Sequence, residues 1–185
     1  MAKTYATLTP ALRDWILQQP LYFLASAPLD AGGHINLSPR GLDSLRITGD
    51  TEIALLDLTG SGNETAAHLQ ENGRLTIMLC AFSGDPKILR LYGQGRVIQH
   101  EDKDWPGYRR LFDPQVPGVR QIFVLQVTRI QTSCGFGVPL MDLVGQRDVL
   151  LDWARKKGPD GIARYQREKN ACSIDGLPAP GLQPE

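Results

Sequence analysis

Three polar segments of the chain contain side chains that could hold an anionic or heteroaromatic ligand. The first is residues 36–41, Asn-Leu-Ser-Pro-Arg-Gly, in which Arg40 and Gly41 end a predicted strand beside the hydroxyl of Ser38 and the amide of Asn36. Because a guanidinium group is planar and always charged, Arg40 could bind a phosphate through two parallel hydrogen bonds or donate to a ring. A solvated arginine at a turn is the alternative interpretation of the same residues.

The second segment is a glycine-rich stretch that contains Thr59, Ser61, Asn63 and Thr65 at a predicted helix start. The backbone N–H groups and the dipole of a helix N-terminus attract anions, and glycines let a ligand approach the backbone closely. The same residues also fit a capping box between Ser61 and Glu64, which needs no ligand. By itself, the segment does not decide between a binding loop and a cap.

The third segment is residues 87–97, Lys-Ile-Leu-Arg-Leu-Tyr-Gly-Gln-Gly-Arg-Val. Alternate side chains of a strand point to the same face, so Arg90, Tyr92 and Gln94 are expected to share one face. Arg90 could supply positive charge to a ligand there. A hydrated outer face explains the pattern without any ligand.

The histidines and cysteines predict no metal site. His34, His68 and His100 are far apart, and none has a second ligand three or four residues away, so we place His68 on a helix surface. The three cysteines are odd in number and lack a CxxC spacing, which indicates a reducing compartment. Cys80 is expected in the core. Cys134 is expected in an exposed loop, where it could be a reactive thiol but is more often an inert small side chain.

The composition is that of an ordinary globular chain. Its 185 residues are 42% hydrophobic, and 20 Lys plus Arg balance 20 Asp plus Glu, so no overall field draws polyanions and no nucleic-acid partner is expected. No apolar run is long enough to predict a membrane span. Small residues at 25–27 resemble a signal-peptidase site, but Arg13, Asp14 and Pro20 interrupt the stretch before them. We therefore expect a cytoplasmic protein.

The elements that must position the three segments are mostly strands. Apolar and alternating runs predict strands over residues 21–27, 34–37, 45–47, 52–58, 74–81, 88–99 and 121–132. Helices are predicted from Pro10, with Thr9 as the cap before it, over 64–70, with Gly73 as the left-handed cap after it, over 148–157 and over 161–169. Because the crossover helices that parallel strands need are absent, the pattern predicts a mainly β fold, an antiparallel barrel of six or seven strands with a few peripheral helices.

In their order along the chain, these segments resemble the pyridoxamine 5′-phosphate oxidase-like, FMN-binding split-barrel family. The resemblance covers about residues 21–131. It is most specific over 59–79, where a glycine-rich loop, a short helix, the sequence Glu-Asn-Gly-Arg and an apolar strand follow in family order. The resemblance implies a split β-barrel and a homodimer with two FMN molecules in clefts between the subunits.

The resemblance and the residues together assign FMN contacts to seven side chains: Ser38, Arg40, Thr59, Ser61, Asn63, Thr65 and Arg90. Asn63 and Thr65 would lie near the phosphate. Where the oxidases carry an Arg-Lys pair, this chain has Glu64 and Thr65, so either Glu64 turns back as a cap or the phosphate lies elsewhere. Arg90 is the candidate to supply the missing charge.

The resemblance implies a flavin-dependent oxidoreductase that acts on a small organic substrate. The chain ending shows no counterpart of the oxidases' substrate-binding motif, so pyridoxamine phosphate is not the first choice of substrate. A non-catalytic flavin- or ligand-binding barrel is the alternative, and FAD or a deazaflavin could take the place of FMN. Because a flavin carries the redox chemistry itself, the sequence identifies no catalytic residue.

Residues 1–132 are expected to form the barrel domain and residues 133–185 a C-terminal helical arm, packed on the same domain or on the dimer partner. We expect the loop 133–139 to lie near the flavin cleft, because its Gly-Phe-Gly-Val-Pro sequence around Phe136 could cover an aromatic ring. An ordinary turn between barrel and arm is the alternative.

Overall fold

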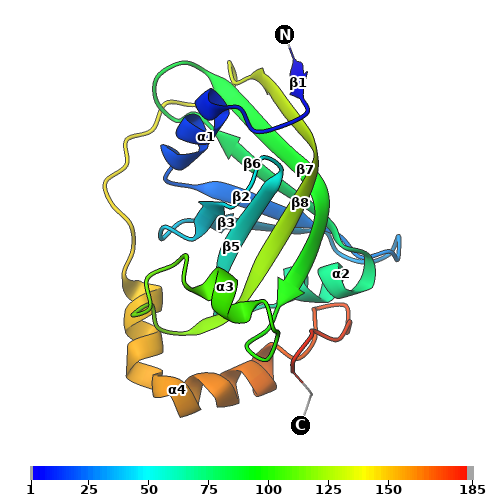
Figure 1. Cartoon of the computed structure of the whole chain (residues 1–185). Coiled ribbons are helices and arrows are strands. Elements are labelled where there is room, and N and C mark those ends of the chain that lie inside the picture. The colour runs from blue at the N-terminus through cyan, green and yellow to red at the C-terminus, as the bar shows by residue number, and fades with distance from the viewer. Residues whose placement is uncertain (1, 183–185) are drawn as a thin grey trace.

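The computed structural model describes residues 2–182 and contains one curled antiparallel sheet with helices around it (Figure 1). The strands are β1 (Lys3–Tyr5), β2 (Tyr22–Ser26), β3 (Asn36–Arg40), β4 (Leu45–Ile47), β5 (Glu52–Leu58), β6 (Arg74–Cys80), β7 (Lys87–Ile98) and β8 (Val119–Cys134). The helices are α1 (Pro10–Leu17), α2 (Glu64–Asn72), α3 (Trp105–Arg109) and α4 (Val149–Lys169).

The strands follow one another across the sheet in the order β3-β2-β6-β7-β8-β5-β4, and β1 pairs with β8 off this path. Neighbouring strands pair antiparallel throughout this order. The long strands β7 and β8 curve around the core, so the sheet closes into a half-barrel (Figure 1). This confirms the mainly β, antiparallel split-barrel fold with few helices.

The inner face of the curled sheet holds the main hydrophobic core. Ile53 and Leu55 on β5 and Leu89 and Leu91 on β7 are fully buried there, because alternate residues of a strand point to the same face. By the same alternation Asp57, two residues beyond Leu55, points inward as well. A charged group therefore lies at the end of an otherwise apolar row.

The second strand of the N-terminal hairpin begins two residues later than predicted. β3 spans Asn36–Arg40 rather than 34–37, because its register with β2 runs from Ser26 opposite Asn36 to Tyr22 opposite Arg40. β1 and α3 were not predicted, since each is too short for a clear periodic pattern. β1 depends on its pairing with β8.

Local signals define the ends of α1 and α2. The backbone N–H of Leu12 donates to Thr9 Oγ1 at 3.3 Å, and Pro10 occupies the first turn, as the sequence predicts. α2 ends at Gly73, which adopts the left-handed conformation with φ of 70°. Both helix ends confirm the predicted capping residues.

The C-terminal part crosses the outside of the barrel. Residues 138–148 run as an extended segment from the end of β8 to α4, and we call this segment the strap (Figure 1). α4 is interrupted at Gly158, with φ of 67°, and Pro159, which explains the two separate helices predicted over 148–157 and 161–169. Residues 183–185 of the predicted arm lie outside the described residues.

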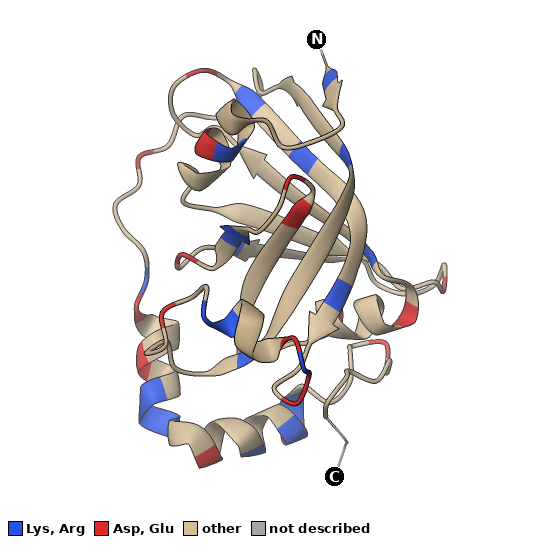
Figure 2. Cartoon of the chain, in the orientation of Figure 1, with Lys and Arg blue, Asp and Glu red and all other residues tan. Residues whose placement is uncertain are grey.

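The end of α4 contacts the barrel of the same chain. Gln166 donates to Thr59 Oγ1 at 2.7 Å, and Asn170 Nδ2 donates to the Gly60 carbonyl at 3.1 Å. Charges of both signs are distributed over the barrel and α4 (Figure 2). Within residues 2–182, no helix combines the length and apolar character that crossing a membrane requires.

Candidate functional site

A cavity of about 600 Å³ opens between β3 and the loop that leads into α2, and we call it the β3–α2 cavity. Five of the seven side chains predicted as cofactor ligands line it: Ser38, Arg40, Ser61, Asn63 and Thr65. Gly60, Gly62 and Glu64 complete the loop side, while Phe123 and Leu150 add apolar surface. The volume is in the range of small-molecule and cofactor sites.

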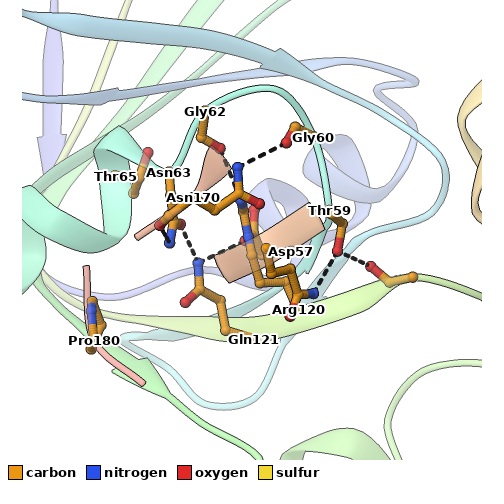
Figure 3. Close-up of polar contacts among 12 residues, drawn as sticks. Asp57, Thr59, Gly60, Gly62, Asn63, Thr65, Arg120, Gln121, Asn170 and Pro180 are labelled. Atoms are coloured by element: carbon orange, nitrogen blue, oxygen red, sulfur yellow. Dashed lines mark hydrogen bonds and ion pairs between the residues drawn. The ribbon is translucent and has the colours of Figure 1, made fainter. Parts of the chain in front are cut away.

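A buried ionic network lies beside this cavity (Figure 3). The carboxylate of Asp57 is 0% exposed, and it accepts hydrogen bonds from Arg40 Nη1, from Arg120 Nε at 2.9 Å and from Gln121 Nε2 at 2.8 Å. Each buried charged group of this network is paired with a group of opposite charge. Such pairing offsets the cost of removing the charges from water.

Neighbouring charges, rather than burial, determine the protonation state of the network. Burial by itself would raise the pKa of Asp57, but the guanidinium groups of Arg120 and Arg40 outweigh it and hold that pKa below its usual value. Burial by itself would lower the pKa of Arg40, but attraction to Asp57 raises it instead. One carboxylate between two guanidinium groups leaves a net positive charge.

The same network fixes the shape of the glycine-rich loop (Figure 3). Arg120 Nη1 donates to the Gly62 carbonyl at 2.9 Å, and Gln121 Nε2 donates to Asn63 Oδ1 at 2.7 Å. Asn63 Nδ2 in turn donates to the Asn170 carbonyl at 3.1 Å, just beyond α4. The loop is therefore held in shape by the protein itself, as a preorganised binding site requires.

Thr59 is buried behind the loop and does not line the cavity. Its hydroxyl donates to the Gly118 carbonyl at 2.9 Å and accepts from Gln166. The amide group of Asn63 is likewise engaged with the protein. These two predicted ligands support the loop through their side chains, and of the two only Asn63 lines the cavity.

Hydroxyl and amide groups connect the two sides of the cavity. Asn36 Nδ2 donates to Thr65 Oγ1 at 3.0 Å, and Ser38 Oγ donates to Asn36 Oδ1 at 3.0 Å. These bonds link β3 to the first turn of α2. Because Thr65 accepts in its bond with Asn36, its own hydroxyl proton is available to a ligand.

The structure does not contain the capping box between Ser61 and Glu64 that was one of the two interpretations of this segment. The residue that precedes α2 is Asn63, whose side chain makes no capping hydrogen bond. Glu64 Oε2 accepts instead from the backbone N–H of Ile174 at 2.9 Å. The carboxylate at the helix start therefore holds the C-terminal segment in place.

Arg40 retains a binding group for a ligand. Its Nη1 is bonded to Asp57 and its guanidinium carbon lies 5.5 Å from the centre of the Phe123 ring, but Nε is buried without a hydrogen-bond partner among the described residues. A buried donor without a partner is costly. The first-turn N–H groups of α2 also lack intrahelical partners. These groups fit a ligand that has both a planar polar ring and an anionic group.

Arg90 lies away from this cavity. Leu89 and Leu91 point into the barrel, so Arg90 is on the outer face of β7, where Nη1 donates to Ser133 Oγ at 3.2 Å. β2 and β6 also separate β7 from β3. The expectation that Arg90 and Arg40 contribute to one site is therefore not met within a single chain.

The loop 133–139 is also distant from the cavity within one chain. β8 is 16 residues long; it begins at Val119, opposite Leu58 beside the glycine-rich loop, and ends at Cys134, opposite Lys87. The loop thus follows the other end of the longest strand, and Phe136 is 83% exposed. Phe136 therefore does not cover the cleft of its own chain, and its contact with the cleft of a partner subunit stays a prediction.

His68 is buried, which corrects its predicted place on a helix surface. α2 packs this side chain against β2, where Ser26 Oγ lies 2.9 Å from His68 Nδ1. Burial lowers the pKa of His68 although three carboxylates nearby oppose this, so the imidazole is neutral at pH 7. Cys80 is buried and Cys134 is exposed, as predicted.

Three features of the site were missed by sequence reasoning. Asp57 interrupts an apolar strand, which is a usable signal for a buried, paired carboxylate. Nothing in the sequence identifies its partner Arg120, which is 63 residues away. Leu42 and Asp43 adopt positive φ angles of 58° and 53°, a strained conformation that is typically retained at functional sites.

Comparisons with known proteins agree with this architecture. A family model described as pyridoxamine 5′-phosphate oxidase matches residues 8–134. A relative from Aspergillus flavus, named "Pyridoxamine 5′-phosphate oxidase family protein ustO", is 39% identical over 94% of this chain and 76% of its own length.

Two solved structures share the fold. HupZ from Group A Streptococcus has a TM-score of 0.54 at 21% identity, over 66% of this chain and 90% of that chain. A Lactobacillus delbrueckii protein provisionally named a pyridoxamine 5′-phosphate oxidase has a TM-score of 0.51 at 14% identity, over 68% of this chain and 94% of that chain.

Proposed function

The chain belongs to the pyridoxamine 5′-phosphate oxidase family, and from this premise we propose that it binds FMN in the β3–α2 cavity and acts as a flavin-dependent oxidoreductase on a small organic substrate. The observation that carries the proposal is Arg40. This residue lines the cavity, is kept charged by Asp57, and has a buried Nε without a partner among the described residues.

The polar groups of the cavity divide between the two ends of an FMN molecule. We assign the phosphate to the first turn of α2, where the N–H groups and the Thr65 hydroxyl can donate. We assign the polar edge of the ring to Arg40 and Ser38 on β3. The net positive charge of the Asp57 network favours negative charge at that edge.

Glu64 opposes a phosphate at the start of α2, because like charges repel. Its bond with the Ile174 N–H offsets part of this repulsion. The ring contacts must therefore supply a larger share of the affinity than the phosphate does. We expect FMN to bind only modestly more tightly than riboflavin.

When bound, FMN supplies the hydride and electron transfer. The residues of the chain bind and orient the reactants. Arg120 and Asn63 hold the loop in shape, and Phe123 and Leu150 exclude water from the apolar side of the cavity. These separate roles explain why the described residues around the site include no conspicuous acid-base pair.

We also propose a homodimer in which the second copy completes each cavity. Phe136, Leu140 and Val144 are exposed apolar residues on and beside the strap that line none of the cavities described here. An interface between two copies would remove these side chains from water, and a stable one buries more than ~1,000 Å². Sedimentation equilibrium tests this, and a monomer at micromolar concentration that retains its flavin would contradict it.

The proposed function is tested by the absorption spectrum of freshly purified protein, with mass identification of the released cofactor. We expect a flavin spectrum and the mass of FMN. Anaerobic reduction by nicotinamide cofactors, followed by reoxidation with candidate acceptors, then separates an enzyme from a flavin-holding protein. A colourless protein that takes up no FMN, or one that carries a haem spectrum instead, contradicts the proposal.

A further inference from the structure

A second and larger cavity, of about 1290 Å³, lies between the strap and the barrel. We call it the strap cavity. Its floor comes from α1, the start of β7 and the turn before it, and its cover comes from the strap and the first turns of α4. The side chains discussed below line it: Trp15, Phe82, Lys87, Met141, Leu143 and Trp153.

The strap cavity borders the β3–α2 cavity. Pro39, Arg40, Gly41 and Leu42 line both, and so does Leu150 on α4. The strained φ angle of Leu42, 58°, lies in this shared wall. A ligand in the strap cavity would therefore reach the β3 side of the proposed flavin site.

Aromatic and apolar groups dominate the surface of the strap cavity. Trp15, Phe82 and Trp153 come from three separate elements, and Met141 and Leu143 of the strap are more than half exposed. Large aromatic side chains bind flat apolar groups well. The surface therefore suits a ligand with a bulky apolar or aromatic body.

A cation lies among these aromatic groups. Lys87 is half-buried, and its Nζ lies 4.9 Å from the centre of the Trp15 ring. No carboxylate pairs with Lys87 in the described part of the chain. The acidic residues of the lining, Asp85 and Asp142, are exposed, so water screens them more strongly than it screens Lys87. This arrangement favours an anionic group on the ligand.

The strap is held at two places, so the cavity can open and adapt. The backbone N–H of Met141 donates to the Phe82 carbonyl at 2.9 Å. Gln146 accepts from the Leu42 N–H at 3.3 Å and donates to the Pro20 carbonyl at 3.0 Å. A segment with few hydrogen bonds and exposed side chains opens at low free-energy cost.

We propose that the strap cavity is the substrate chamber, and that the substrate is a bulky, largely apolar or aromatic molecule with a carboxylate or similar anionic group that binds Lys87. That the ligand of the strap cavity is a substrate rests on the proposed flavin site in the neighbouring cavity. The preference for an anionic aromatic ligand rests on the strap cavity alone.

Calorimetric titration with three matched probes tests the proposal: 2-naphthoate, 2-naphthalenemethanol and 2-naphthylmethylammonium. Flavin-free and FMN-loaded protein are both titrated. We expect 2-naphthoate to bind most tightly and the ammonium probe most weakly. Equal binding of the three probes, or a preference for the ammonium probe, overturns the inference.

Two variants locate the binding. Lys87→Gln should weaken 2-naphthoate about ten-fold, the effect of losing one charged hydrogen bond, and leave the alcohol unchanged. Lys103→Gln changes an exposed lysine outside this cavity; it is the matched control and should leave the binding of all three probes unchanged.

Gly145→Leu should weaken the binding of all three probes, because Gly145 lines the cavity and an added Cβ there meets nothing within 4 Å. Unchanged 2-naphthoate binding in Lys87→Gln and Gly145→Leu overturns the inference.

The outcomes separate this inference from the proposed function. FMN uptake without binding of any naphthalene probe overturns the substrate chamber, as when a second copy fills the cavity, and leaves the flavin site intact. Binding that depends on Lys87 in a protein that takes up no flavin supports the cavity as a ligand site and contradicts the proposed function.

Discussion

The β3–α2 cavity and the strap cavity share a wall but are built in opposite ways. Beside the first, Asp57 and Arg120 are buried and paired, and hydrogen bonds with β8 and with Asn170 at the end of α4 fix the loop. Across the second, the strap has exposed apolar side chains and Lys87 has no carboxylate partner among the described residues. One cavity is rigid and polar, and the other is adaptable and apolar.

This difference matches the needs of two kinds of ligand. A resident cofactor is always the same molecule, so a preformed site lowers the entropic cost of binding it. A substrate must enter and leave, which requires an element that opens easily.

Asp57→Asn should have the largest effect. It leaves two guanidinium groups around a neutral amide, and removing one partner of a buried ion pair costs about 3–5 kcal/mol of unfolding free energy. Urea denaturation measures this. Asp104→Asn breaks the exposed pair with Arg96 and should cost less than about 1 kcal/mol. Equal losses in the two variants would show that the network is not the rigid part of the site.

Arg40→Gln should weaken FMN and riboflavin alike, by about 1.5–3 kcal/mol, because Arg40 is assigned to the ring. Flavin fluorescence titration of folded protein measures both affinities. Arg90→Ala is the matched control, since it removes an arginine from the outer face of β7. A loss of FMN affinity in Arg90→Ala would instead mean that Arg90 acts on the cavity of a partner subunit.

The two histidines tied to other elements are expected to contribute to stability with opposite pH dependence on the two sides of pH 6.5. His68 has a pKa lowered by burial, so the unfolded chain binds more protons below its ordinary value of 6.5, and stability falls as the pH drops. His34 has a pKa raised by its hydrogen bond to Asp175, so its contribution is lost as the pH rises above 6.5. His68 lies on α2 and His34 is bonded to the C-terminal segment, and both of these border the rigid cavity.

Unfolding free energies measured across this pH range test the two contributions separately. His68→Gln should flatten the acid side of the profile, and His34→Gln the alkaline side. An acid side that is equally steep in wild type and His68→Gln would show that burial of this imidazole does not limit stability.

Gln146→Ala should have the smallest effect on stability. The substitution removes the hydrogen bonds that join the strap to Leu42 and to Pro20. Because both bonds are exposed, their loss should lower the free energy of unfolding by about 1 kcal/mol or less. Hydrogen exchange should become faster in residues 138–148 and remain unchanged in the glycine-rich loop. Faster exchange in both segments would show that the two cavities are not independent.

The parts of the fold that depend on local chemistry could be predicted from the sequence. Pro10 and Gly73 define helix ends through their own backbone preferences, and β5, with its apolar pattern over Glu52–Leu58, lies where it was predicted. β3 was displaced because register is decided between strands rather than within one.

The candidate site was predictable only in part, for the same reason. Ser38, Arg40, Ser61, Asn63 and Thr65 converge because family order reflects the fold. Which face a side chain occupies depends on packing, so His68 and Arg90 were misplaced. The strap cavity could not be foreseen, since its walls come from segments that show no pattern linking them.

The central claim, that FMN binds in the β3–α2 cavity, is tested most directly by two leucine substitutions at glycines that have space around them. Gly60 lines the β3–α2 cavity and Gly145 lines the strap cavity, and an added Cβ at either meets nothing within 4 Å. FMN titration should show a loss of at least about ten-fold in Gly60→Leu and wild-type affinity in Gly145→Leu. Wild-type FMN affinity in Gly60→Leu, with the protein folded, would contradict the account.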